Sequence, residues 1–179
     1  MNSHLPIDAA IRNALVSYPN FPKPGIVFKD ISPVFSNPEL VKRMVSHIIK
    51  TWKTPPDVVL GIESRGFLLG SVMAYEWNRP FIMARKKGKL PGPVWQQSYN
   101  LEYNTSVLEL QQNALKQNQN VLITDDVLAT GGTASAAAQL VLKSGARIMG
   151  FQFLLTLENL KGSELLRTFK APYFELTRL

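Results

Sequence analysis

The stretch from 121 to 143 constrains the fold of this chain more than any other part of the sequence. It starts with a short apolar run, 121–124, of the kind found in strands buried on both faces. Two adjacent carboxylates, Asp125 and Asp126, follow the run, and the alanine-rich segment 134–143 predicts a helix soon afterwards. A buried strand that turns tightly into a helix is typical of α/β folds, in which ligands bind beyond the carboxyl ends of the strands.

The loop between this strand and this helix has the composition of a phosphate-binding loop. It reads Ala129-Thr130-Gly131-Gly132-Thr133. The two glycines can adopt positive φ and let backbone N–H groups converge on one point, while the threonines add hydroxyl donors. The N-terminus of the following helix adds partial positive charge. We therefore predict a phosphate site here; a plain turn from an acidic strand end into a helix is the alternative.

The two carboxylates need their own explanation, because Asp125 and Asp126 would repel a neighbouring phosphate. They fit the site if they bind sugar hydroxyls or a divalent cation. Two other phosphate-binding patterns fail: Gly61 and Gly66 have P-loop spacing, but Phe67 occupies the lysine position, and the sequence contains no G-x-G-x-x-G. The loop therefore belongs to neither of those classes.

Strands and helices alternate along the rest of the chain. Apolar runs predict strands at 57–62, 81–84 and 148–157, and helical periodicity predicts helices at 37–52 and 65–77. This alternation predicts an α/β fold with a mostly parallel, doubly wound sheet.

We expect a single domain over residues 1–179 with two special segments. Residues 1–35 are expected to form an N-terminal helix and hood, in which apolar residues at 7–18 have the spacing of one amphipathic helix. Residues 85–104 are polar and interrupted by glycine and proline, so we expect a long mobile loop, which is a functional candidate by its length.

Composition limits the class of partner. Twenty Lys and Arg against thirteen Asp and Glu give a net charge of +7, which favours an anionic partner: nucleic acid, a membrane surface or a phosphorylated small molecule. No run approaches the ~18 apolar residues that a membrane helix needs, and the first residues lack the pattern of a secretory signal. The absence of cysteine excludes disulfides and Cys-ligated zinc. We expect a cytoplasmic protein.

Five motifs resemble one family in content and order. They lie at 21–33, 61–67, 85–93, 98–103 and 121–133, and read FPKPGIVFKDISP, GIESRGF, RKKGKLPGP, SYNLEY and VLITDDVLATGGT. Together they resemble the type I phosphoribosyltransferases and, within that family, the members that act on adenine. The resemblance implies transfer of phosphoribose from 5-phosphoribosyl 1-pyrophosphate (PRPP) to adenine, which yields AMP and pyrophosphate in purine salvage. It also implies Mg²⁺ held mainly by PRPP, a homodimer, and no nucleic-acid or membrane partner.

The resemblance assigns a part of PRPP to each group of residues. Asp125 and Asp126 would bind the ribose hydroxyls. The 5′-phosphate would be bound by Ala129, Thr130, Gly131, Gly132 and Thr133. The pyrophosphate would be met by Glu63, Ser64, Arg65, Arg85, Lys89 and Tyr103. Arg65 is also expected to have a catalytic role, because a guanidinium makes bidentate contacts with phosphate oxygens, and a cis peptide is expected in its loop.

The expected loop 85–104 would close over the site and exclude water. Its first residues carry four cations, Arg85, Lys86, Lys87 and Lys89, for which a solvated surface is the alternative interpretation. Near its far end, the resemblance makes Glu102 the general acid/base beside adenine N7. An exposed loop glutamate is the alternative there.

Adenine is expected to bind between two apolar side chains. Phe28 would stack on the purine and Leu157 would cover its opposite face, while backbone groups near Val27 and Lys29 pair with its edge. A short packed strand at 26–28 is compatible with this role, because those contacts are made by the main chain.

Four residues depart from the family pattern. Thr124 stands where an apolar strand residue is usual and Asn104 where glycine is common, while Thr156 and Ser163 replace glutamate and arginine. None of them lies in the phosphate loop, so they bear on the edge of the base pocket and on C-terminal packing.

Two other functions stay open at this stage. The first is a phosphoribosyltransferase for another base, such as xanthine or hypoxanthine, against which Val27-Phe28-Lys29 and Glu102 argue. The second is a non-catalytic nucleic-acid-binding regulator on the same fold. The sequence contains no appended DNA-binding helix pair and no basic stripe interleaved with aromatics, which argues against it.

Overall fold

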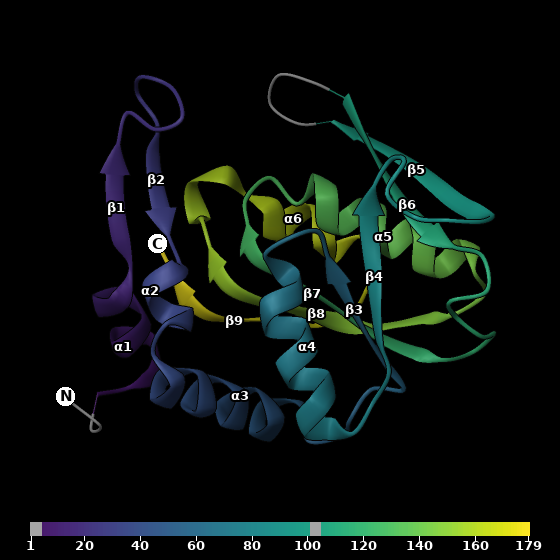
Figure 1. The fold of residues 1–179 in the computed structure, drawn as a ribbon, viewed down its shortest axis with the longest axis horizontal. Helices are drawn as coiled ribbons and strands as arrows, with labels where there is room; N and C mark the ends of the chain where they lie inside the picture. The colour runs from purple at the N-terminus through teal and green to yellow at the C-terminus, as the bar shows by residue number, and fades with distance from the viewer. Residues whose placement is uncertain (1–4, 101–104) are drawn as a thin grey trace.

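The computed structural model describes residues 5–100 and 105–179, and within them the core is one seven-stranded sheet. Its strand order is β5-β6-β4-β3-β7-β8-β9 (Figure 1). The bounds are β3 Val58–Ile62, β4 Phe81–Lys86, β5 Val94–Asn100, β6 Thr105–Gln111, β7 Asn120–Leu128, β8 Arg147–Thr156 and β9 Tyr173–Arg178. The run from β4 to β9 is parallel, whereas β6 pairs antiparallel with β4, and β5 antiparallel with β6. The predicted α/β fold with a mostly parallel sheet is confirmed.

Helices cover both faces of this sheet. Their bounds are α1 Ile7–Ala14, α2 Ser32–Phe35, α3 Pro38–Trp52, α4 Gly66–Trp77, α5 Gly132–Lys143, the 3-10 turn Glu158–Leu160 and α6 Gly162–Arg167. Leu60 packs in the core formed with α5, whereas its neighbour Val59 packs in the core formed with α1, α3 and α4. Because successive side chains of a strand point to opposite faces, this alternation produces the doubly wound arrangement.

The long helix α3 shows how the sequence fixes an element. Pro38 occupies its first turn, and the Asn37 side chain accepts a hydrogen bond of 3.1 Å from the Leu40 N–H. Both features are favoured at helix N-termini. The buried face is formed by Leu40, Met44, Val45, Ile48 and Trp52, largely as the apolar spacing predicts.

The N-terminal segment differs from the expected single helix. Helix α1 ends at Ala14, and Tyr18 lies half-exposed in a strand, β1 (Val16–Pro19). This strand pairs antiparallel with β2 (Val27–Asp30) in a separate two-stranded sheet. A strand partner eleven residues downstream overrides the helical spacing at 15–18, and the hairpin rises beside the main sheet (Figure 1).

The described part of the segment 85–104, residues 85–100, is also not the long loop that its composition suggests. Strand β4 continues to Lys86, and β5 pairs along its whole length with β6, so that within 85–100 only the turn at 87–93 lacks regular structure. The prediction failed because β5 shows no clear alternation of apolar and polar residues, and its partner strand lies beyond the segment. Movement of this hairpin stays a prediction.

Two further differences concern one strand that is longer than predicted and one that was not predicted. Strand β7 extends to Leu128, so that the two aspartates lie within it rather than after it. Strand β9, at the edge of the sheet, was not predicted. Among the described residues, no helix has the length and apolar character needed to cross a membrane.

Candidate active site

The predicted phosphate loop lies between β7 and α5. Gly131 caps the helix in the left-handed conformation, with φ of 81°, and its carbonyl accepts from the Ser135 N–H at 2.8 Å. A Cβ atom on Gly131 would lie 2.7 Å from the Gly162 carbonyl oxygen, and one on Gly162 would lie 2.2 Å from the Ala129 oxygen. The loop and Gly162 therefore pack backbone to backbone. Of the two glycines expected to be able to adopt positive φ, only Gly131 does so, because Gly132 is already the first residue of α5.

Gly162 is a structural residue of this site that the sequence analysis missed. It begins α6, 31 residues after Gly131, and the contact depends on how β8 returns the chain to the loop. The only local signal is a glycine next to Lys161, whose own φ is 53°.

The two aspartates have different environments. Asp126 is buried, and its Oδ2 lies 2.8 Å from Nε of Arg65. The partly buried Asp125 accepts a hydrogen bond of 2.9 Å from the Asp126 N–H through Oδ1. Burial and the adjacent charge of Asp126 raise the pKa of Asp125 well above its usual value. A Cβ on Gly66 would lie 2.9 Å from Asp125 Oδ1, so α4 begins directly against this pair.

Arg65 connects this pair to the N-terminal hood. Its guanidinium carbon lies 5.6 Å from the centroid of the Phe28 ring, within the range of a cation–π contact. Phe28 also packs edge-to-face with Phe21, the ring centroids being 5.2 Å apart. The structure thus brings the predicted base-stacking residue and a predicted ribose-binding residue to the two sides of one arginine.

The other predicted adenine residues are less closely grouped. Val27 is exposed, and Lys29 donates from Nζ to Oγ of Ser17 at 2.8 Å within the hairpin. Leu157 is half-buried after β8, where its N–H donates to the carbonyl of Leu128. Their predicted contacts with the base stay predictions.

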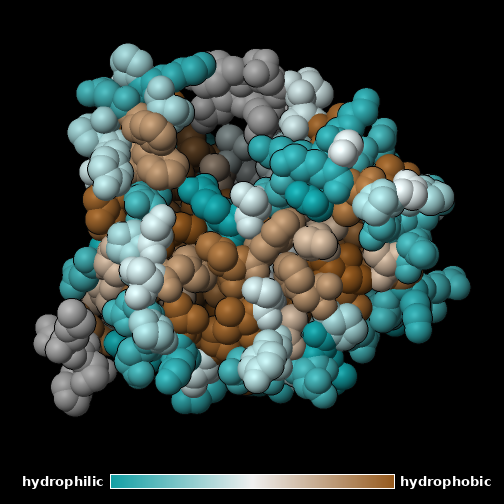
Figure 2. Space-filling view, viewed as in Figure 1, coloured by the Kyte–Doolittle hydropathy of each residue, from teal (hydrophilic) through white to brown (hydrophobic). Residues whose placement is uncertain are grey.

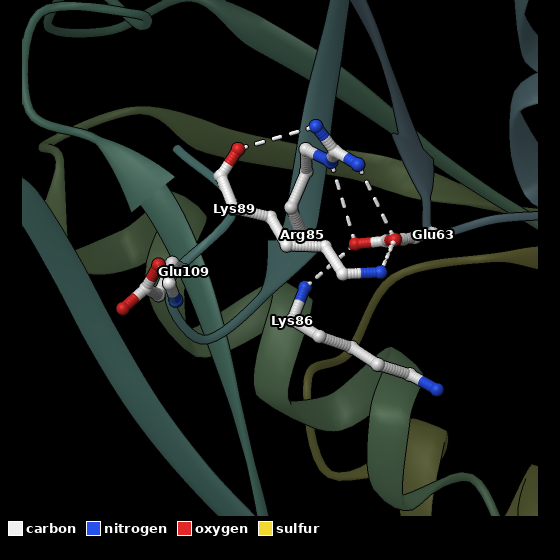
Figure 3. Close-up of polar contacts among 6 residues, drawn as sticks. Glu63, Arg85, Lys86, Lys89 and Glu109 are labelled. Carbon is white, nitrogen blue, oxygen red and sulfur yellow. Dashed lines mark hydrogen bonds and ion pairs between the residues drawn. The ribbon is translucent and has the colours of Figure 1, made fainter. Parts of the chain in front are cut away.

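A second polar group lies where β3 and β4 end (Figure 3). The buried Glu63 carboxylate accepts from the Lys86 N–H at 2.9 Å and from Lys89 Nζ at 2.6 Å. Arg85 approaches it through Nε and Nη2, each at 3.4 Å. Burial alone would raise the pKa of Glu63, but the hydrogen bonds from Lys89, Lys86 and Arg85 outweigh it and lower the pKa to about 2. The Glu63–Ser64 peptide is cis, as the resemblance implied.

Glu109 is the second residue that the sequence analysis missed. It lies in β6 opposite Arg85 and is only 3% exposed. Its carboxylate accepts from the Gly88 N–H and from the Gln96 amide, at 2.9 and 2.8 Å. Glu109 therefore fixes the opposite side of the turn that carries Lys89.

The structure divides the predicted pyrophosphate residues into two groups. Glu63, Arg85 and Lys89 contact one another, whereas Arg65 contacts Asp126 and Phe28. Within 5–100 and 105–179, no hydrogen bond or ion pair joins the two groups. Glu102 and Tyr103, together with Asn104, lie outside the described residues.

The acidic residues of the site do not form a divalent-cation site in the protein itself. The described part of the chain contains no cluster of three or more His, Cys, Asp or Glu side chains able to hold a metal. Asp126 is paired with Arg65, and the pKa of Asp125 is raised. Both features disfavour a cation ligand, because Mg²⁺ prefers ionised carboxylates that are not already paired.

Comparison with known proteins adds independent information. Residues 32–168 match the family model described as phosphoribosyl transferase domain. The chain is 46% identical over 155 residues to the adenine phosphoribosyltransferase of Natranaerobius thermophilus, with 86% of this chain and 91% of the relative covered. It is 43% identical over 153 residues to that of Nitrosopumilus maritimus, with 85% and 90% covered.

Solved structures of the same family are also similar to this chain. The adenine phosphoribosyltransferase of Giardia lamblia complexed with 9-deazaadenine superposes with a TM-score of 0.92 at 35% identity, over 98% of both chains. That of Saccharomyces cerevisiae, complexed with an imino-altritol bisphosphate and adenine, gives 0.88 at 38% identity over 95% of this chain and 98% of the other. The chain therefore belongs to the phosphoribosyltransferase family and, within it, to the adenine phosphoribosyltransferases.

Proposed function

We propose that the protein transfers phosphoribose from PRPP to adenine and releases AMP and pyrophosphate. The observation that carries this proposal is the chain of contacts from Phe28 through Arg65 to Asp126, next to the Gly131 loop. This order of an aromatic ring, a carboxylate and a glycine loop supports the proposal, because AMP presents a base, a sugar and a phosphate in the same order. The named relatives act on adenine.

In the proposed reaction, a ring nitrogen of adenine attacks the anomeric carbon and forms the glycosidic bond. The bond from that carbon to the pyrophosphate oxygen breaks, and its electron pair leaves with pyrophosphate. The chain holds the 5′-phosphate at 129–133 and orients the ribose through Asp125 and Asp126, which brings the reacting atoms into line. Arg85 and Lys89 stabilise the charge that develops on the leaving group.

We further propose that Glu102 takes the proton that adenine loses. This assignment rests on the resemblance of the Leu-Glu-Tyr motif. The change Glu102→Gln should strongly lower turnover and leave the affinity for PRPP nearly unchanged. Unchanged turnover would rule out Glu102 as the proton acceptor.

Magnesium is proposed as a companion of the substrate, held mainly by PRPP oxygens. Because the acidic residues do not fit a metal site of their own, no step above is routed through the ion. Cytoplasmic localisation also stays a proposal.

The experiment that tests the function measures initial rates of nucleotide formation from PRPP with adenine, hypoxanthine, guanine, xanthine and orotate, each with and without Mg²⁺. We expect AMP formation from adenine to be the fastest reaction. A preference for any other base, or salt-dependent nucleic-acid binding without turnover, would contradict the proposal.

We also propose a homodimer, supported by apolar side chains exposed on one stripe of α4. Leu68 is 47% and Tyr75 82% exposed, and they lie two turns apart on the same helix. Figure 2 shows apolar residues gathered over the face on which α4 lies. Exposed apolar patches of this kind mark protein interfaces. The molecular mass in solution, measured for the protein and for Tyr75→Lys, tests this: we expect a dimer that the substitution weakens.

A further inference from the structure

Glu63 presents a problem for the site just described. Glu63 is itself among the residues expected to meet pyrophosphate, yet a pKa of about 2 keeps its carboxylate negatively charged at neutral pH. A carboxylate repels a phosphate oxygen of the same charge, and both oxygens of Glu63 already accept from Lys86, Lys89 and Arg85, so direct contact with pyrophosphate is disfavoured.

The burial of the three side chains indicates a different role. The Glu63 side chain is 6% exposed, whereas those of Arg85 and Lys89 are 30% and 49% exposed. The two cations therefore cover the carboxylate, and an anion that arrives from solvent meets them first. The three groups together carry one net positive charge.

The cations keep donors for such an anion. Arg85 uses three of its five N–H groups, two on Glu63 and one on the Lys89 carbonyl at 3.1 Å, and Lys89 uses one of its three on Glu63. Within the described residues, two N–H groups on each side chain have no acceptor. Glu63 thus fixes both cations and leaves their outer donors available.

The backbone below them is fixed as well. The Lys86 N–H donates to Glu63, the Lys87 N–H to the Val107 carbonyl at 3.1 Å, and the Gly88 N–H to Glu109. Three successive N–H groups of the turn are therefore occupied, two of them by carboxylates from other strands. Figure 3 shows the Arg85 and Lys89 side chains and the Lys86 backbone nitrogen directed at Glu63, with Glu109 on the other side of the turn.

From this geometry we propose that Glu63 is a positioning residue: it holds Arg85 and Lys89 in place for the pyrophosphate end of PRPP. The inference rests on the proposed function and deepens it, since it separates the residues that touch pyrophosphate from the one that acts through them. Fixed donors bind and stabilise a developing charge better than mobile ones, because no reorganisation is needed during the reaction.

The test compares Glu63→Gln, Lys89→Met and the double variant. Isothermal titration gives the affinity for inorganic pyrophosphate and for ribose 5-phosphate, and kinetics give separate KM values for PRPP and adenine. For Glu63→Gln we expect pyrophosphate affinity to fall about tenfold and the KM for PRPP to rise, with ribose 5-phosphate affinity and the KM for adenine unchanged. In the Lys89→Met background the same change should cost less affinity than in the unmodified protein, because only Arg85 is left for Glu63 to hold.

Three results would overturn the proposal. They are unchanged pyrophosphate affinity, tighter pyrophosphate binding, which would mean that Glu63 only repels the anion, and fully additive losses in the double variant. Glu63→Asp keeps the charge and should recover part of the pyrophosphate affinity. If Glu63→Gln does not fold, the pyrophosphate affinity of Glu63→Asp is the test, and a value equal to that of the unmodified protein would count against the proposal. Glu158→Gln, at an exposed ion pair with Arg178, serves as the control.

Failure of the inference can be distinguished from failure of the proposed function. If the unmodified protein forms no AMP from adenine and PRPP, the function is wrong. If it forms AMP and Glu63→Gln behaves like the unmodified protein, only the inference is wrong.

Discussion

The phosphate loop at 129–133 and the cationic turn at 85–89 are proposed to bind the two ends of the same substrate, but they are built in opposite ways. The loop uses main chain: a glycine with φ of 81°, a helix N-terminus and a close backbone contact with Gly162. The turn uses charged side chains that are held by Glu63, on a backbone that is held by Glu109.

The difference teaches how each binding site is made specific. Backbone N–H groups of a fixed loop cannot swing away, so the loop needs only close packing below it. Long cationic side chains have many rotamers and lose conformational entropy when they are fixed. The turn therefore needs buried acceptors, and it obtains them from residues 21 to 26 positions away in the sequence.

The largest effect is expected where the main-chain loop is disturbed, in Gly162→Ala. The new Cβ would lie 2.2 Å from the Ala129 oxygen and 2.8 Å from the Gly131 nitrogen, and backbone cannot rotate away as a side chain can. We expect the free energy of unfolding to fall by about 3 kcal/mol. Affinity for ribose 5-phosphate, measured by titration, should fall with it, while pyrophosphate affinity changes less.

Gly92→Ala is the control for this prediction. Gly92, unlike Gly162, has a positive φ, of 75°, and nothing lies within 4 Å of its added Cβ. The expected cost is about 1 kcal/mol, due to the backbone conformation alone. Equal losses in the two variants would show that packing against Gly162 does not support the loop.

The same difference explains what could be predicted from the sequence. The strand, loop and helix at 121–143 were predicted because their glycines, carboxylates and apolar residues are neighbours in the chain. The functions of Gly162 and Glu109 depend on contacts between distant segments, and no local pattern reveals those. Strand β5 was missed for a related reason: polar residues such as Gln96 find their hydrogen-bond partners only after β6 has paired with the strand.

A smaller effect is expected where the turn loses one of its carboxylates, in Glu109→Ala. Without this side chain, the Gly88 N–H and the Gln96 amide lose their acceptors. We expect a loss of about 2 kcal/mol in unfolding free energy, together with weaker pyrophosphate binding and unchanged ribose 5-phosphate binding. Glu158→Ala, at an exposed ion pair, should change stability by less than about 0.5 kcal/mol. A fall in both affinities would mean that the turn and the loop are not independent.

The charge of Glu63 also predicts a pH dependence. Its pKa falls from the usual 4.5 to about 2 on folding, so the folded chain binds this proton less readily than the unfolded chain. The stability that Glu63 contributes is therefore complete above about pH 4.5 and is lost as the pH falls toward 2. Urea unfolding between pH 2.5 and 7 should show a shallower acid-side loss in Glu63→Gln than in the unmodified protein. Parallel curves would show that the ion pairs with Arg85 and Lys89 do not stabilise the fold.

The smallest effect concerns the support below the phosphate loop. Thr124 directly precedes Asp125 in β7, is fully buried, and its hydroxyl has no partner in the described part of the chain. An unpaired buried hydroxyl destabilises a protein, so Thr124→Val, which keeps the shape, should raise the unfolding free energy by about 1 kcal/mol. Thr177 is the matched control, because it is equally buried but donates to Asp8, and Thr177→Val should destabilise the protein. If the phosphate loop depends only on its own backbone and on Gly162, the affinity for ribose 5-phosphate stays the same in Thr124→Val. A change in that affinity would show that the buried part of β7 also supports phosphate binding.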